Sequence, residues 1–350
     1  MFMHALTRWF SPFMLVLMAL AWNSAAFCAD LDDAIQNDDL GKVKTLLKKN
    51  PNLVSIKNAN DETALFAAVS DNHVEIVNFL LSNNADVNAK GTNDLTPLHE
   101  AVLKGYKRTE EMLLAKGADV HAKDMWGRTP LHFAAMNDRK DVMEVLLAND
   151  SDANARDAMG QSPLHMAAGS GYKDVVDLLL ANGADIDARD DNGMTPLHNA
   201  VLADRIELAQ ILLDHSADVN TRDNEGATPL HSAAARGYKD MTTLLLSKGA
   251  KINTVDGDGQ TPLHCAALRN RQDVAQLLMA GKADINAKDF QGRTPLCIAV
   301  HGGYRDMAEF LLANGADVNA RDNQGFTPLR IAADGKNEVM AELLREHGGT

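Results

Sequence analysis

A histidine recurs at one fixed position in six copies of a Thr/Ser-Pro-Leu-His motif, and successive copies are 33 residues apart. These histidines are His99, His132, His165, His198, His231 and His264. They could be catalytic bases, metal ligands or structural residues. Ligands of one zinc ion must all approach within about 2 Å of the metal, whereas stacked helices are about 10 Å apart, and a general base needs a nucleophile beside it. We therefore predict a buried imidazole that hydrogen-bonds the helix cap and a neighbouring loop, and no bound metal.

Acidic turns are the second candidate for chemistry, because carboxylates in a loop can bind calcium. A calcium loop of the EF-hand type needs a glutamate at its twelfth position. Counted from Asp256 this position is Ala267, and counted from Asp190 it is Val201. The sequence also contains no phosphate-binding loop, no H-E-x-x-H motif and no G-x-S-x-G motif. We therefore expect solvated turn acids, no cofactor and no catalytic activity.

Both features belong to a repeat that continues without insertion or deletion over residues 30–350. The repeat markers are Thr63, Thr96, Thr129, Ser162, Thr195, Thr228, Thr261, Thr294 and Thr327. We predict that residues 30–62 form a degenerate capping unit and that 322–350 form a truncated one. Such units contact only their neighbours and form one extended domain.

The unit at residues 124–156 predicts a turn, a helix, a second turn and a second helix. Thr129 is the residue type of a helix N-cap, and it precedes a proline at the first helical position. Asp138 stands where other units have glycine, asparagine or aspartate, the residues that tolerate positive φ. The second helix is expected to bury one apolar face, made by Val142, Val145 and Leu146.

This pattern, DxxGxTPLHxAA…G…LLLxxGADVNA, resembles the ankyrin repeat. The resemblance implies an all-α ankyrin-repeat solenoid of about ten 33-residue helix-turn-helix units with hairpin turns. It also implies a non-catalytic protein that recognises a protein partner through hairpin tips and the concave inner-helix face. Four residues depart from the repeat motif, namely Ala64, Phe66, Cys297 and Arg330. Ala64 replaces the proline, whereas Phe66, Cys297 and Arg330 replace the histidine, which shows that the histidine is dispensable.

Residues 1–29 lie outside the repeat and have the layout of a secretory signal peptide. They contain the single charged residue Arg8, an apolar stretch at 13–22, and the small residues Ser24, Ala25 and Ala26. We expect cleavage between Ala26 and Ala29, and therefore export to a periplasm or secretion. A lipoprotein anchored through Cys28 is the alternative, although the large Phe27 precedes that cysteine.

The net charge of the chain limits the classes of partner that it can bind. Its formal net charge is −14, and a surface this acidic repels phosphate groups, whose binding depends on lysine and arginine. We expect no nucleic-acid partner, no membrane contact beyond an anchor at Cys28, and a monomer. Cys265 and Cys297 lie in adjacent units, too far apart for a disulfide, and we interpret both as packing residues.

A finer alternation suggests that the array is built from pairs of units. All four tyrosines share one repeat position, and the units between them carry arginine there; the residues are Tyr106, Arg139, Tyr172, Arg205, Tyr238, Arg271 and Tyr304. The second helix likewise ends alternately in glycine and in another residue, as at Gly117, Asp150, Gly183, Ser216, Gly249, Lys282 and Gly315. The tyrosines either pack at the turn between helices or form a row of docking rings.

Large apolar residues gather at the positions that the resemblance assigns to partner recognition. These predicted binding residues, with their polar rim, are Leu95, Leu103, Met125, Trp126, Arg128, Met136, Met159, Gln161, Met194 and Leu202. We predict a site centred on Trp126 with Met125 and Met159, because tryptophan is a frequent hot-spot residue and methionine adapts to irregular surfaces. The alternatives to a binding scaffold are a structural spacer without a specific partner and a secreted enzyme.

Overall fold

The computed structural model describes residues 29–350, which divide into two compact units, 29–158 and Met159–Thr350. Residues 1–28 of the predicted signal peptide, Cys28 among them, lie outside the described residues. Within 29–350, every helix is too short or too polar to cross a bilayer.

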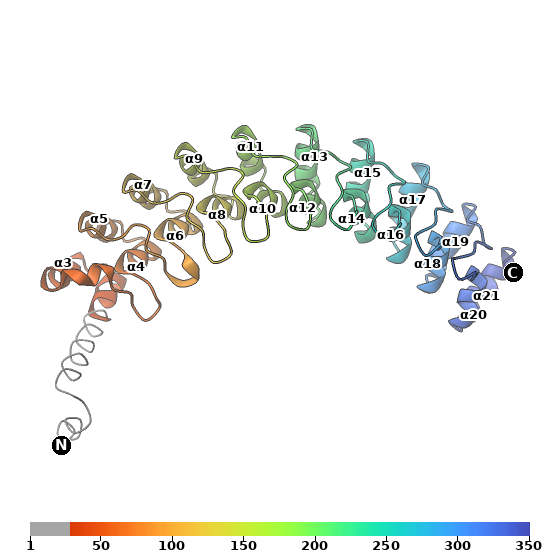
Figure 1. Cartoon of the computed structure of the whole chain (residues 1–350), viewed down its shortest axis with the longest axis horizontal. Helices are drawn as coiled ribbons and strands as arrows, with labels where there is room; N and C mark the ends of the chain where they lie inside the picture. The colour runs from red at the N-terminus through yellow and green to blue at the C-terminus, as the bar shows by residue number, and fades with distance from the viewer. Residues whose placement is uncertain (1–28) are drawn as a thin grey trace, which may run out of the picture. The chain divides into compact units, whose positions relative to one another are not determined.

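The first unit consists of paired helices and two short 3-10 turns. A helix at residues 29–36 is followed by α3 (Leu40–Lys49), η1 (Pro51–Ser55), α4 (Ala64–Ser70), α5 (Val74–Ser82), η2 (Thr92–Asp94), α6 (Pro97–Lys104), α7 (Lys107–Ala115), α8 (Pro130–Met136) and α9 (Lys140–Ala148). The inner helices α4, α6 and α8 pack in one layer, and the outer helices α3, α5, α7 and α9 pack in a second (Figure 1).

The second unit continues the same alternation of inner and outer helices. Its elements are α10 (Pro163–Ser170), α11 (Lys173–Ala181), α12 (Pro196–Leu202), α13 (Ile206–Asp214), α14 (Pro229–Arg236), α15 (Lys239–Ser247), α16 (Pro262–Leu268), α17 (Gln272–Ala280), α18 (Pro295–His301), α19 (Arg305–Ala313), α20 (Pro328–Asp334) and α21 (Glu338–Glu346). Even-numbered helices pack against one another, as do consecutive odd-numbered helices from α11 to α19. The predicted all-α architecture of about ten paired units is confirmed.

The predicted helix signals are confirmed in the unit at 124–156. Thr129 is extended (φ −91°, ψ 166°) and caps α8, which begins at Pro130. Asp138 is left-handed (φ 53°) at the turn between α8 and α9. The expected apolar face of α9 is wrong in one residue: Val142 and Leu146 are buried, but Met143 is buried in place of the half-buried Val145. The outer helix therefore buries adjacent positions against its own inner helix and its neighbours.

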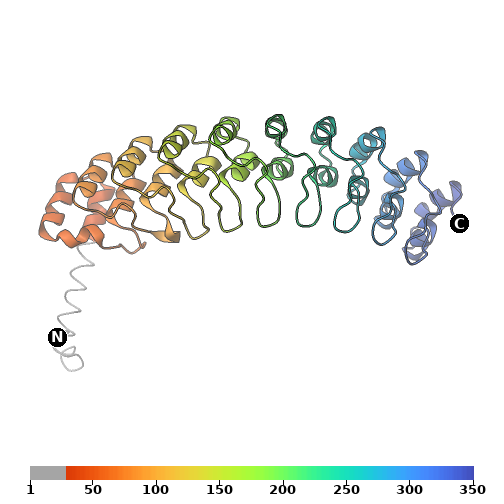
Figure 2. The same ribbon diagram turned by 45° about the horizontal axis from the view of Figure 1, so that its top comes forward.

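Hairpin loops join consecutive repeats and extend beyond the inner helices in each unit (Figure 2). Their tips are linked by backbone hydrogen bonds from one repeat to the next. Ala158 N–H donates to the Trp126 carbonyl at 2.8 Å, and Phe290 N–H donates to the Asp258 carbonyl at 3.0 Å. Gly127 has φ 76°, and a Cβ there would lie 2.7 Å from the Ala158 nitrogen. Glycine is thus required at the tip by both its own conformation and the approach of the next loop.

The alternation of tyrosine and arginine has a packing reason. A tyrosine unit has glycine before the tyrosine, and the arginine of the following unit lies across that glycine. A Cβ on Gly237 would be 2.7 Å from Cδ of Arg271, and a Cβ on Gly105 would be 2.8 Å from Nη1 of Arg139. All four tyrosines are half-buried. Glycine in one repeat and arginine in the next therefore form a complementary pair, which explains why units alternate in twos.

This pairing can be tested by comparing two glycines with similar backbone conformations. Gly237 has φ +80° and is covered by Arg271, whereas Gly249 has φ +88° and has nothing within 4 Å of an added Cβ. We expect Gly249→Ala to lower the free energy of unfolding by about 1 kcal/mol, the cost of left-handed backbone for alanine. Gly237→Ala should cost about 1 kcal/mol more, because Arg271 must move. Urea unfolding measures both, and equal losses would contradict the pairing.

Candidate protein-binding surface

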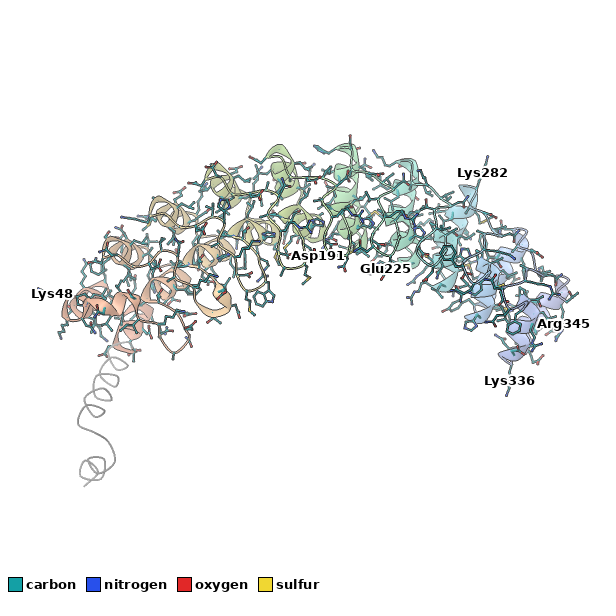
Figure 3. The ribbon with its side chains drawn as sticks, in the orientation of Figure 1. Lys48, Asp191, Glu225, Lys282, Lys336 and Arg345 are labelled. Carbon is teal, nitrogen blue, oxygen red and sulfur yellow. The ribbon has the colours of Figure 1, made fainter. Side chains whose placement is uncertain are left out.

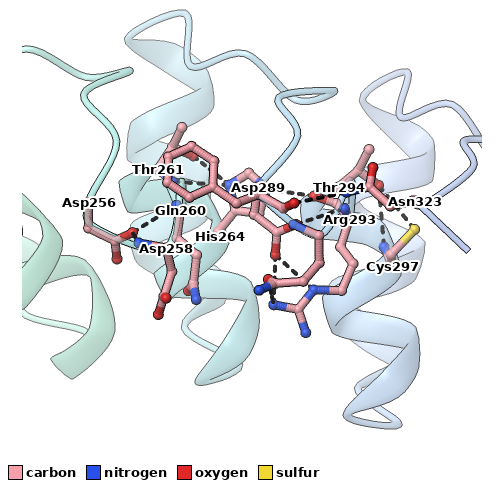
Figure 4. Close-up of polar contacts among 12 residues, drawn as sticks. Asp256, Asp258, Gln260, Thr261, His264, Asp289, Arg293, Thr294, Cys297 and Asn323 are labelled. Atoms are coloured by element: carbon pink, nitrogen blue, oxygen red, sulfur yellow. Dashed lines mark hydrogen bonds and ion pairs between the residues drawn. The ribbon is translucent and has the colours of Figure 1, made fainter.

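The repeated histidine bonds to the cap of its own inner helix and, in several repeats, to the loop of the next repeat. In Figure 4, Thr261 N–H donates to Nδ1 of His264 at 3.1 Å, and the Thr261 hydroxyl lies 2.9 Å from the same nitrogen. Nε2 of His264 lies 3.0 Å from the carbonyl of Arg293 in the next loop. A backbone N–H can only donate, so Nδ1 is unprotonated and Nε2 carries the proton and donates it. The predicted hydrogen bonds to the cap and to a neighbouring loop are confirmed.

The other five histidines receive the same bond from their caps. The cap N–H to Nδ1 distances are 3.1–3.2 Å for His99, His132, His165, His198 and His231. Nε2 donates to the Arg128 carbonyl from His99, and to the Met194 and Gln260 carbonyls from His165 and His231. Nε2 of His198 is buried without a hydrogen bond of normal geometry, although the Ala227 carbonyl lies near it.

Burial keeps these imidazoles neutral. Desolvation lowers the pKa of His198, His231 and His264, and it lowers the pKa of His99 to about 4. Because each Nδ1 is occupied by a cap and the ring is closed off from solvent, these histidines are unsuited to serve as general bases for a bound substrate.

Repeats without the histidine replace its contacts in other ways. Cys297 N–H donates to Thr294 Oγ1 at 3.4 Å, and that hydroxyl lies 3.5 Å from the Cys297 sulfur. Phe66 instead places its ring 3.4 Å from the position of a Cβ on Gly91. Both substitutions keep the cap or the packing but provide no ring N–H for the next loop.

The hairpin tip at Trp126 is braced from within its own repeat. Oδ1 of the buried Asp124 accepts N–H bonds from Trp126 at 3.0 Å and Arg128 at 2.8 Å. Oδ2 of Asp124 binds Nη2 of Arg128 at 2.7 Å. The Arg128 guanidinium then stacks on Trp126 at 4.6 Å and on Phe133 at 4.5 Å. Trp126 is therefore held in place on one face while its side chain stays 42% exposed.

The predicted binding residues differ in exposure. Those in the first unit are Leu95, Leu103 and Arg128, which are half-buried, and Met125, Trp126 and Met136, which are exposed. Those in the second unit are Gln161, Met194 and Leu202, which are half-buried, and Met159, which is exposed. Met125 at 57% and Met159 at 61% are among the most exposed apolar side chains of the described residues. The single patch formed by all ten stays a prediction.

One exposed aromatic tip is not among the predicted binding residues. Phe290 is 66% exposed at its hairpin tip, and its repeat has the same brace, in which Arg293 Nε donates to Asp289 Oδ2 at 2.8 Å. The signal was present in the sequence, because D-F-Q-G-R at 289–293 parallels D-M-W-G-R at 124–128. The same unit also has a groove of 670 Å³ between α18 and α20. Arg293, Tyr304, Phe326 and Ile331 are among its lining residues.

The hairpin side of the second unit also carries acidic groups. Figure 3 shows Asp191 and Glu225 on the hairpin side of this unit, with Lys282 on the opposite side. Both acidic residues are exposed at the tips of consecutive loops. The tips thus combine apolar residues in some repeats with carboxylates in others, so the repeats offer different chemistry from a common backbone.

The repeated architecture agrees with the comparison to known families. The sequence matches the family described as ankyrin repeats (three copies) over the overlapping ranges 31–124, 111–190, 182–256, 222–289, 253–322 and 281–350. The chain belongs to the ankyrin-repeat family. Members of this family are typically protein-binding scaffolds and usually non-catalytic. No curated protein matches the chain significantly.

The thiols of these ankyrin repeats are packing groups. Both cysteines in the described residues are free. Burial raises the pKa of Cys265 to about 12, so its sulfur stays a thiol and is a poor nucleophile. Cys297 is buried beside its cap. Among the described residues, no cluster of three or more histidine, cysteine, aspartate or glutamate side chains could hold a metal ion.

One acidic residue of the ankyrin stack is buried without a partner. Glu110 on α7 is fully buried, and neither of its carboxyl oxygens has a hydrogen bond. The equivalent residues of the adjacent repeats are Val77 and Met143, both buried and apolar. Desolvation raises the pKa of Glu110 to about 8, with further increases from Asp141 and Glu111 and a smaller opposing effect of Lys107. Glu110 is therefore protonated at neutral pH and weakens the first unit.

Glu110→Met is expected to stabilise the protein increasingly as the pH rises. The pKa of Glu110 is about 8 when folded, against a reference value of 4.5, so the folded state holds an extra proton between these values and loses stability as the pH rises. Removing the carboxyl should add about 3 kcal/mol more stability at pH 8 than at pH 5. Urea unfolding at both pH values measures this, with Glu144→Met on α9 as the exposed control. A gain independent of pH would show that Glu110 does not titrate as described.

Proposed function

We propose that this chain is a non-catalytic scaffold that binds a protein partner through hairpin tips and the inner-helix face. The observation that carries the proposal is the tip formed by Met125 and Trp126, which are 57% and 42% exposed. The Asp124–Arg128 brace fixes this tip before any partner binds, which reduces the entropy lost on binding. An exposed, pre-positioned tryptophan is a typical centre of binding energy.

The tip favours a binding scaffold over a spacer and over an enzyme. A spacer without a specific partner gains nothing from exposed apolar side chains, which promote aggregation. An enzyme would need an accessible base or nucleophile, whereas the repeated histidines are buried in caps and the Cys265 thiol has a raised pKa. The family also supports a protein partner, because ankyrin repeats are typically protein-binding scaffolds.

We also propose that the scaffold acts in an exported compartment, a periplasm or the cell exterior. The support is the sequence of residues 1–29, with Arg8, the apolar stretch at 13–22 and the small residues that follow. N-terminal sequencing of the mature protein should begin after Ala26 and no later than Ala29. A mature protein that begins at Met1 would overturn the export proposal while leaving the binding proposal intact.

Trp126→Ala should weaken partner binding much more than it weakens the fold. Affinity capture from the exporting compartment with wild-type protein identifies the partner, and its dissociation constant is then measured for each variant. We expect a loss of at least about 2 kcal/mol in binding and of about 0.5–1 kcal/mol in stability, from the lost stacking on Arg128. The matched control is Val339→Ala, which removes an apolar side chain that is 61% exposed on α21.

Two results would contradict this proposal. Equal losses of binding and stability in Trp126→Ala would mean that the tryptophan acts as a core residue. Equal losses of binding in Trp126→Ala and Val339→Ala would mean that the partner recognises exposed apolar surface in general rather than the hairpin tip.

A further inference from the structure

A groove in the second unit is lined by arginines. It has a volume of 500 Å³ and lies where α14, α16 and the turn before α17 meet. Arg236, Arg269 and Arg271 line it together with Ser232, Tyr238 and Leu202. We call this set the arginine groove. Three guanidinium groups around one groove are unexpected in a chain whose net charge is −14.

The arginines of the groove are not neutralised within the described residues. Within the described residues, none of the three arginines forms an ion pair. Their one hydrogen bond is donated by Arg271 Nε to the Ala235 carbonyl, and at 3.4 Å it is long. Elsewhere in the same unit, Arg293 and Arg330 each bind a carboxylate of their own repeat at 2.7 Å. The arginine groove therefore keeps its N–H donors available to a ligand.

Helix capping does not account for the cations. Arg236 and Arg269 occupy equivalent positions at the ends of α14 and α16, where a positive charge favours the helix dipole. The same position is Ala203 at the end of α12 and Gly302 at the end of α18. These inner helices thus end without an arginine at this position, so the arginine is not needed to end the helix.

The geometry of the groove suits carboxylates on an extended chain. Equivalent residues of adjacent repeats are about 10 Å apart, which three residues of an extended polyproline II segment span at about 3.1 Å each, with the side chains of residues i and i+3 on the same face. Arg271 is held over Gly237 by the glycine–arginine pairing. A guanidinium offers a planar pair of donors to a carboxylate, and the Tyr238 and Ser232 hydroxyls can donate to the remaining oxygens. Leu202 provides an apolar wall beside them.

We propose that the arginine groove binds an acidic segment of the partner protein, with carboxylates three residues apart held by Arg236 and Arg269. Arg271 supplies the fixed third guanidinium between the two repeats. The inference rests on the proposed function and names the chemistry of the partner. The acidic tips at Asp191 and Glu225 disfavour such a segment on those two loops.

The test uses the full chain and a fluorescein-labelled peptide with glutamate at positions i and i+3 in a serine–leucine background. We expect saturable binding that weakens with salt, and a loss of about tenfold or more in Arg236→Gln/Arg269→Gln. The matched control is Arg305→Gln/Arg345→Gln, which removes the same charge from outer helices α19 and α21. Thermal unfolding confirms that both variants fold. A phosphoserine peptide and inorganic phosphate serve as competitors.

Several outcomes would overturn this inference. They are no binding of the glutamate peptide, equal losses in the two arginine variants, and tighter binding of the phosphoserine peptide than of the glutamate peptide. Failure of the proposed function is distinguishable. If partner binding requires Trp126 but is unchanged in Arg236→Gln/Arg269→Gln, the arginine-groove proposal is wrong and the scaffold proposal stands. If no partner requires Trp126 for binding while the peptide binds as expected, the proposal of a binding tip at Trp126 is wrong and the arginine-groove proposal stands.

Discussion

One imidazole links the polar requirements of two neighbouring repeats. The N-terminus of each inner helix leaves backbone donors without helical partners, and the cap N–H of Thr261 gives its bond to Nδ1 of His264. The same ring donates from Nε2 to the carbonyl of Arg293, which belongs to the next repeat. A repeat is therefore fully hydrogen-bonded only when its neighbour is docked. Since an unpaired buried polar group costs about 1–3 kcal/mol, this bond couples apolar stacking to a specific register.

The same hydrogen bond also fixes the backbone of the hairpin loops that form the proposed binding surface. The carbonyl that His99 binds belongs to Arg128, whose side chain holds Asp124 and stacks on Trp126. His264 binds the carbonyl of Arg293, whose side chain holds Asp289 beside the exposed Phe290. In both repeats a buried ring fixes the backbone from which an exposed aromatic projects. The tips can therefore vary in sequence without changing their position.

The sequence predicted the fold and its local chemistry because the determinants are local and repeated. The cap at Thr129, the left-handed turn at Asp138 and the role of the histidine each follow from a few neighbouring residues. The packing of Arg271 over Gly237 could not be predicted from neighbouring residues. The two residues are 34 positions apart, and only the stacking of repeats brings them together. The arginine groove and the burial of Met143 were missed for the same reason. Phe290 was predictable from its motif, and its exposure required the geometry of the loop.

The most direct test of this account is the protonation of the six cap histidines, measured by ¹⁵N NMR of the imidazole nitrogens. At pH 7, the account predicts that all six are neutral, with an unprotonated Nδ1 and a protonated Nε2, and that His99, whose pKa is lowered to about 4, remains so at pH 5.5. The exposed His121 and His301 give reference signals in the same spectrum. Cap histidines found as imidazolium ions, or as the tautomer protonated on Nδ1, would contradict the claim that these rings join the repeats.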